Sequence, residues 1–259
     1  MIHVNDLNLH YSEDGDPNGR PVVFSNSLGT DLRLWDRLLP QLPKGLRLIR
    51  YDKRGHGLSD CPVGQFGMGD LVQDAAGLMD ALGIKDAVFV GLSIGGIIAQ
   101  GLAAERPDLV KAMVLADTAA KIGTPAMWQD RIDAVRKGGI VSLADPILER
   151  WFSKSFRETR STELAGWRNM LIRTSLDGYA GCSLAIAETD LLESTARLTL
   201  PTLVVVGDED GATPPDLVRE TAELIPGSTF RVISGAGHLP CIEKPEIMAE
   251  HITTFLAGL

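Results

Sequence analysis

The segment that decides the fold is Val88-Phe89-Val90-Gly91-Leu92-Ser93-Ile94-Gly95-Gly96-Ile97-Ile98-Ala99-Gln100. Its first part is apolar and β-prone, as is typical of a strand buried on both faces, and its second part consists of small and aliphatic residues that favour a helix. Gly91 to Gly95 between them fits Gly-x-Ser-x-Gly, the nucleophile elbow, a tight turn that exposes the serine hydroxyl. Glycine is needed at both positions because side chains there would collide with neighbouring backbone. A plain glycine turn with a helix-capping serine is the alternative.

Composition limits the classes of protein that this chain can be. Its 259 residues suffice for one large α/β domain with an insertion and a substantial core. A net charge of −9 argues against nucleic acid or an anionic membrane as partner. No apolar run approaches the roughly 18 residues of a membrane helix, and the N-terminus lacks a signal peptide, so we expect a cytoplasmic protein. The three cysteines are far apart, which predicts neither a disulfide framework nor a zinc site.

Strand and helix patterns alternate over most of the chain. Apolar strands are predicted at 21–24, 46–51, 88–91, 110–116 and 201–207, with a last strand at 229–233, and amphipathic helices at 71–82, 215–224 and 245–256. This order implies a mainly parallel sheet with helices on both faces. Between 119 and 192 the spacing is helical and three of the four tryptophans occur there. We therefore predict a core of residues 1–118 and 193–259, with 119–192 as an all-α cap.

Three residues that follow separate strands suggest nucleophilic catalysis. Ser93, an aspartate after the strand 201–207, and His238 occur in the order expected for a serine–acid–histidine triad at the carboxyl edge of such a sheet. A serine hydroxyl becomes a good nucleophile only when an imidazole takes its proton, and the imidazole needs a carboxylate to fix its tautomer. Spacing alone does not choose between Asp208 and Asp210, and Asp117 is a third candidate for the acid.

Acyl transfer also requires two N–H donors for the oxyanion. The elbow supplies the backbone amide of Ile94, and the second donor should come from the loop after the strand 21–24, which points to Ser27. His56 lies in a loop rich in glycine and charged residues, which fits a structural loop better than a catalytic base.

Several motifs together identify the chain as similar to the α/β-hydrolase superfamily. They are Asn26-Ser27-Leu28-Gly29-Thr30-Asp31, Tyr51-Asp52-Lys53-Arg54-Gly55-His56-Gly57, Gly91-Leu92-Ser93-Ile94-Gly95-Gly96, Gly207-Asp208-Glu209-Asp210 and Gly237-His238. Within it the chain most resembles the 3-oxoadipate enol-lactonases. The segments 117–124 and 148–152, with Trp128, resemble the cap of those enzymes. Many superfamily members carry His-Gly where this chain has Ser25-Asn26, and the lactonases share that departure.

The resemblance implies a serine hydrolase that converts 3-oxoadipate enol-lactone to 3-oxoadipate in the β-ketoadipate pathway of aromatic catabolism, without cofactor or metal. It selects Asp210 as the acid, at the fourth position of Gly-x-x-Asp. Serine at the elbow argues against haloalkane dehalogenases and epoxide hydrolases, which have aspartate there. Another serine esterase, a carbon–carbon bond hydrolase or a perhydrolase is the alternative enzyme. A non-catalytic ligand receptor on this fold is the alternative from another class.

The expected substrate is a small anion, and the cap must accommodate its charge. A carboxylate that loses water in an apolar pocket needs a cation or several hydrogen-bond donors. We expect one or two cap arginines to point inward, with Arg131 and Arg150 as candidates. Trp128 and Trp151 are expected to form pocket walls, with packing inside the cap as the alternative for each. The sequence predicts no oligomeric state.

Overall fold

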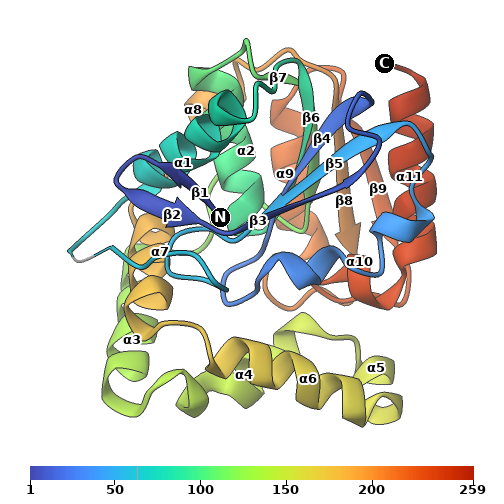
Figure 1. The fold of residues 1–259 in the computed structure, drawn as a ribbon. Coiled ribbons are helices and arrows are strands. Elements are labelled where there is room, and N and C mark those ends of the chain that lie inside the picture. Colours follow the sequence, from blue (N-terminus) through green and yellow to red (C-terminus); the bar gives the residue numbers. More distant parts are fainter. Residues whose placement is uncertain (63) are drawn as a thin grey trace.

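A seven-stranded sheet forms the centre of the molecule (Figure 1) in the computed structural model, which describes residues 1–62 and 64–259. Its strand order is β3-β5-β4-β6-β7-β8-β9, and β3 alone runs antiparallel to its neighbour. The strands are β3 Tyr11–Gly15, β4 Arg20–Ser25, β5 Leu46–Tyr51, β6 Ala87–Leu92, β7 Val110–Ala116, β8 Thr202–Gly207 and β9 Thr229–Ile233. The predicted mainly parallel sheet is confirmed. A short hairpin of β1 Ile2–Val4 and β2 Leu7–Leu9 precedes it.

The register of the central strands brings their carboxyl ends to one edge. Ser25 pairs with Gly91, Leu92 with Ala116, and Gly207 with Ile233. All six residues of β6 and of β8 are buried, which explains their continuous apolar sequences. The loops that follow these strands therefore emerge side by side, and they carry the residues singled out above.

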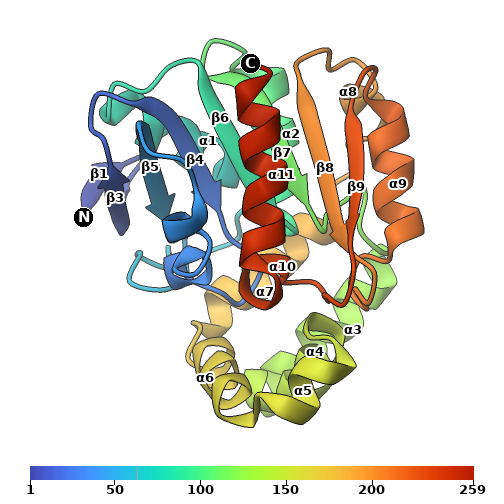
Figure 2. The same cartoon turned by 90° about the vertical axis from the view of Figure 1, so that its right-hand side faces the viewer.

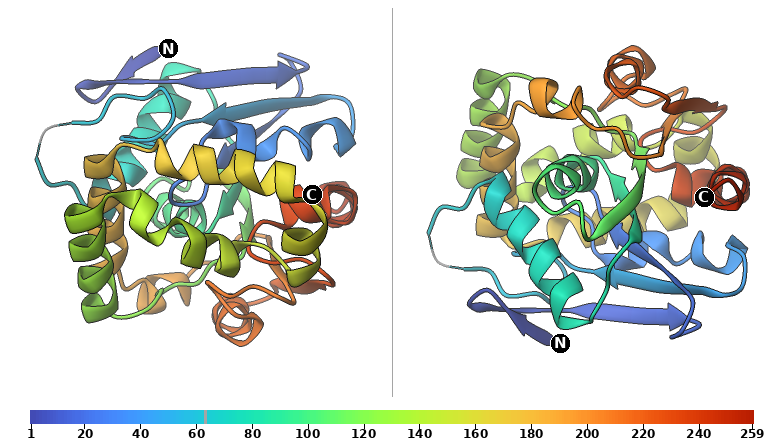
Figure 3. Two further views of the ribbon diagram at one scale, coloured as in Figure 1. Left: turned by 90° about the horizontal axis from the view of Figure 1, so that it is seen from below. Right: turned by 90° about the horizontal axis from the view of Figure 1, so that it is seen from above.

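Helices cover both faces of the sheet, as predicted (Figures 2 and 3). Helices α1 Met68–Ala81, α2 Ile94–Glu105 and α9 Pro215–Leu224 lie in a row on one face, with α8 Leu192–Thr195 between α2 and α9. Helix α11 Pro245–Ala257 and the short turns η1 Leu32–Trp35, η2 Leu39–Gln41 and α10 Pro240–Glu243 cover the other. Helix α1 begins three residues before the predicted start at 71, because the Asp70 carboxylate accepts the Gly67 amide and caps the first turn.

All regular elements between β7 and β8 are helices, and those from α3 to α7 lie across the carboxyl edge of the sheet (Figure 1). They are α3 Pro125–Gly138, η3 Ile140–Leu143, α4 Ala144–Trp151, α5 Lys154–Thr159, α6 Ser161–Ile172 and α7 Leu176–Ala187, whereas α8 lies against the sheet face between α2 and α9. The expected all-α cap insertion is thus present. Within the described ranges no helix has both the length and the apolar character needed to cross a membrane.

Candidate active site

Ser93 occupies a strained backbone position between β6 and α2. Its φ of 58° and ψ of −121° are unfavourable for a residue with a side chain. Hydrogen bonds hold this conformation: the Ser93 amide donates to Ala116, and its carbonyl accepts from Thr118 Oγ1 at 2.6 Å. A Cβ atom on Gly91 or on Gly95 would lie 2.1 Å from a backbone oxygen. The explanation of the two glycines by close backbone approach is confirmed.

His238 and Asp210 form a buried pair beside this serine. His238 Nδ1 lies 2.9 Å from Asp210 Oδ2, and both side chains are almost fully buried. Asp210 also accepts hydrogen bonds from the amides of Ala212 and Thr213 and from Thr213 Oγ1. Burial acts to raise the pKa of Asp210, but His238 and the hydrogen bonds hold that pKa below its ordinary value. Asp210 is therefore ionised and accepts a hydrogen bond from His238 Nδ1, which leaves Nε2 to accept a proton.

The other two candidate acids do not bind His238 in the described parts of the chain. Asp208 accepts from Ser234 Oγ and the Gly235 amide and orders the loop after β9. Asp117 is fully buried, accepts the Gly207 amide through Oδ1 at 2.9 Å, and has no partner within the described residues for Oδ2. Burial, and next the charge of Asp210, raise the pKa of Asp117 well above its ordinary value. Asp117 thus favours the protonated carboxyl form more than an ordinary aspartate does, and it lies close to the His–Asp pair.

One group of side chains in the described ranges has the spacing of metal ligands. Single ligand atoms of Asp117, Asp210 and His238 lie within 4.8 Å of one another. The direct hydrogen bond between Asp210 and His238 already uses two of these atoms. The arrangement therefore fits a histidine that is oriented by an ionised carboxylate.

The loop after β4 provides backbone donors beside the serine. Ser27 and Leu28 line the same cavity as Ser93 and His238. Across the described residues, the amides of Ser27, Leu28 and Ile94 donate no hydrogen bond to the protein. Ser27 Oγ lies 3.4 Å from His238 Nε2. The amide of Leu28 is a candidate that the sequence analysis missed, because a backbone donor requires no particular side chain.

The cavity above Ser93 is small and is closed by the cap. It measures about 70 Å³, and Ser93 and His238 form part of its floor. Trp128 from α3 and Trp151 from α4 line it while being only 5% exposed, so each contributes both to the wall and to packing of the cap. Tyr179 of α7 completes this aromatic wall. The sequence analysis did not single out Tyr179, although an aromatic residue in the cap was a usable signal.

Arg131 and Arg150 lie where the cavity meets a depression on the outside of the cap. This depression, of about 250 Å³ between α3 and α4, shares both arginines with the inner cavity. The Arg131 guanidinium lies over the Trp128 ring, 5.1 Å from its centroid. Neither arginine forms an ion pair with a described carboxylate, whereas Arg157, Arg160 and Arg168 of the cap do. The boundary of the cavity thus carries two cations.

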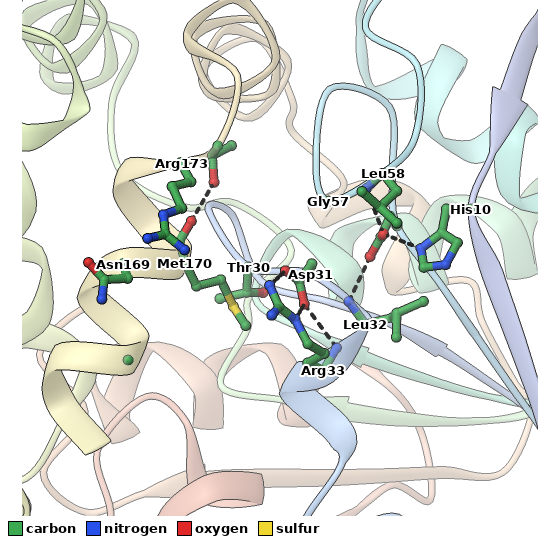
Figure 4. A pocket seen from close by; sticks show the side chains of 13 residues that line it. His10, Thr30, Asp31, Leu32, Arg33, Gly57, Leu58, Asn169, Met170 and Arg173 are labelled. Atoms are coloured by element: carbon green, nitrogen blue, oxygen red, sulfur yellow. Dashed lines mark hydrogen bonds and ion pairs between the residues drawn. The ribbon is translucent and has the colours of Figure 1, made fainter. Parts of the chain in front are cut away.

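A larger cavity, of about 540 Å³, is lined in part by residues 30–32 of the loop after β4, which we call the oxyanion loop (residues 27–32) (Figure 4). Asn169 of α6 and Arg173, directly after that helix, lie opposite Asp31 and Arg33. Asp31 and Arg33 pair with each other, and His10 pairs with the buried Asp52. This cavity and the one that contains Ser93 share no lining residue, so the two spaces are distinct.

The cap is bound directly to the loops that carry the acid and the histidine. The Gly211 amide donates to the Arg150 carbonyl, and the His238 amide donates to the Trp151 carbonyl. The buried carboxylate of Glu243 accepts from the Gly237 amide and from both the amide and the hydroxyl of Ser153. The end of α4 is therefore positioned by the same loops as the His–Asp pair.

Comparison with known proteins agrees with this geometry. The sequence profile of the alpha/beta hydrolase fold family matches residues 20–245. The chain is 35% identical to 3-oxoadipate enol-lactonase 2 of Acinetobacter baylyi, over 95% of this chain and 91% of that one. It superimposes on the crystal structure of the enol-lactonase from Burkholderia xenovorans LB400 with a TM-score of 0.95, 38% identity and 98% coverage of both chains. A malate-bound thermophilic esterase from Thermogutta terrifontis gives a TM-score of 0.91 and 31% identity, over 97% of this chain and 94% of that one.

One assignment follows from three observations: the strained serine between β6 and α2, the His–Asp pair from the loops after β9 and β8, and a sequence match over most of the chain. The chain belongs to the alpha/beta hydrolase fold family.

Proposed function

We propose that this protein is a serine hydrolase that opens 3-oxoadipate enol-lactone to 3-oxoadipate. The observation that carries the substrate assignment is the position of Arg131 and Arg150. Both line the small cavity that contains Ser93 and His238, and neither is paired with a described carboxylate. The two enol-lactonases named above, at 35% and 38% identity, support the same substrate.

The charge of this substrate matches the charge of the cavity boundary. The enol-lactone has a free carboxylate, which must lose water as it enters a cavity walled by Trp128, Trp151 and Tyr179. A guanidinium offers a carboxylate two parallel hydrogen bonds, and these strengthen as water is excluded. Arg131 also contacts the Trp128 ring, 5.1 Å from its centroid, which restrains the position of its guanidinium. The aromatic side chains can cover the flat lactone ring.

The reaction follows from the proton positions at the His–Asp pair. Nε2 of His238 takes the Ser93 proton as Oγ bonds to the lactone carbonyl carbon, while Asp210 stabilises the imidazolium. The amides of Ile94 and of Ser27 or Leu28 bind the oxyanion. Collapse of the tetrahedral intermediate breaks the bond between the carbonyl carbon and the ring oxygen. The imidazolium protonates that oxygen, and the resulting enol later tautomerises to the ketone. Water then hydrolyses the acyl-enzyme, with His238 accepting its proton.

The test is turnover of enol-lactone formed in situ, followed by the loss of its ultraviolet absorbance. We expect rapid hydrolysis by the wild type and a loss of about 10⁴- to 10⁶-fold in kcat for Ser93→Ala. Comparison with 4-nitrophenyl acetate separates a lactonase from a general esterase. A wild type that hydrolyses neither compound while binding the lactone would instead be a receptor.

A further inference from the structure

Lys53 is a buried cation without a role in the reaction described so far. It lies two residues beyond the end of β5, and its side chain is 1% exposed. Burial lowers its pKa to about 8, against the opposing influence of Cys182, Asp52 and Asp31. A buried lysine loses the hydration of its ammonium group, which is costly unless a specific interaction compensates. We therefore expect a specific interaction to stabilise the buried ammonium group.

The ammonium group binds the oxyanion loop. Lys53 Nζ donates to the Ser27 carbonyl at 2.7 Å, and Thr30 Oγ1 donates to the same oxygen at 2.9 Å. That carbonyl belongs to the peptide group whose N–H is the amide of Leu28. This amide donates to no described residue, and Leu28 lines the cavity above Ser93. One peptide group thus has a cation on its oxygen and a free N–H beside the nucleophile.

Neighbouring residues of the same segment bind the rest of the loop. Asp52 accepts the Leu32 amide at 2.7 Å, and His56 Nε2 accepts the Gly29 amide at 3.0 Å. Burial and then the charge of Lys53 lower the pKa of His56 well below its ordinary value, so His56 is a neutral acceptor. The segment 52–56 therefore holds the loop 27–32 at the Ser27–Leu28 peptide and at two amides that follow it.

We propose that Lys53 is a positioning residue of the oxyanion hole: its ammonium group orients and polarises the Ser27–Leu28 peptide so that the Leu28 amide binds the oxyanion. A cation on a carbonyl oxygen draws electron density from the peptide and makes its N–H a stronger donor, and low polarity around the pair increases the effect. Lys53 does not touch the substrate. The inference rests on the proposed serine-hydrolase function and adds a second donor held by a buried charge.

The charged state of Lys53 gives the inference a pH signature. The groups around the ammonium are the carboxylates of Asp31 and Asp52, the imidazole of His56, and the thiol of Cys182 on α7. The pKa of Cys182 is raised by burial to about 12, and His56 is already neutral at pH 7, so neither changes charge between pH 7 and 9.5. Lys53 loses its charge as the pH rises through about 8.

The experiment compares the wild type with Lys53→Met, a change that keeps the length of the side chain but removes the charge. Lys121→Met is the matched control, because Lys121 is half exposed and pairs with Asp190 on the outside of the cap. We expect Lys53→Met to lower kcat for 4-nitrophenyl acetate at least tenfold with KM changed less than threefold, and Lys121→Met to change neither. Loss of one oxyanion donor typically costs 10²- to 10³-fold, and a displaced donor costs less.

A second measurement is the pH dependence of kcat. The kcat of the wild type should fall as the pH rises through about 8, and this decline should be absent from Lys53→Met. Equal kcat for wild type and Lys53→Met, or a wild-type kcat that stays flat from pH 7 to 9.5, would overturn the inference. Failure of the lactonase proposal is a different result, seen when the wild type hydrolyses the nitrophenyl ester but not the lactone.

Discussion

The backbone amide of His238 donates a hydrogen bond of 2.8 Å to the carbonyl oxygen of Trp151. This bond joins the loop of the candidate catalytic histidine to the residue that ends α4 and forms part of the cavity wall. The histidine and the wall above it therefore cannot move independently. Glu243 strengthens the link, since it accepts hydrogen bonds from Gly237 on one side and Ser153 on the other.

Glu243→Ala should consequently lower both stability and activity. It leaves three buried donors without a partner, and each such loss costs about 1–3 kcal/mol. We expect the free energy of unfolding in urea to fall by about 3 kcal/mol or more and kcat to fall because the His238 loop is less well fixed. Glu246→Ala, at an exposed position in the first turn of α11, is the control. Equal urea midpoints for the two variants would contradict this interpretation.

Asp210→Asn and Asp208→Asn separate the two carboxylates that follow β8. Asp210 binds His238 Nδ1, so an amide there favours the wrong imidazole tautomer and should lower kcat by about 10⁴-fold. Asp208 binds Ser234 and Gly235 at the surface, and its replacement should change kcat less than about threefold. Steady-state kinetics on the lactone measure both effects. The opposite ranking would move the acid to Asp208.

Much of the fold could be predicted because its signals are local. The strands at 46–51, 110–116 and 229–233 and the helix at 215–224 have the bounds that apolar runs, turn residues and prolines indicated. The parallel order then followed from helices of sufficient length between strands. Ser93, Asp210 and His238 could be singled out because their side chains carry the chemistry and their chain order is restrictive.

The parts that could not be predicted depend on contacts between distant segments. Leu28 was missed because an amide donor is independent of residue type. The bond from Lys53 to the Ser27 carbonyl joins residues 26 positions apart, in the loops that follow the neighbouring strands β5 and β4, and a lysine in a polar loop is ordinarily solvated. The bond between Ser153 and Glu243 spans 90 positions. Such contacts are set by tertiary packing, for which a single sequence has no pattern.

Arg131→Gln should weaken lactone binding selectively. A hydrogen bond to a charged group contributes about 1.5–3 kcal/mol, so we expect KM for the lactone to rise about tenfold or more. KM for the uncharged 4-nitrophenyl acetate should change little, and Arg150→Gln should act in the same direction. Arg136→Gln, exposed on the same helix and outside this cavity, is the control. A change of less than about threefold in the ratio of the two KM values, for both arginines, would show that the carboxylate binds elsewhere.

Asp117→Asn should stabilise the protein at neutral pH. Burial and then the charge of Asp210 raise the pKa of Asp117 well above its ordinary value, so the folded chain holds a proton that the unfolded chain releases near pH 4. Because the folded state binds more protons in this range, the stability of the wild type falls as the pH rises, by up to about 1.4 kcal/mol per pH unit. Asparagine has no proton to lose, and its oxygen can still accept the Gly207 amide. In urea unfolding from pH 4 to 7, the free energy of unfolding of the variant should therefore increase relative to that of the wild type as the pH rises. A constant difference between the two would mean that Asp117 is ionised in the folded protein.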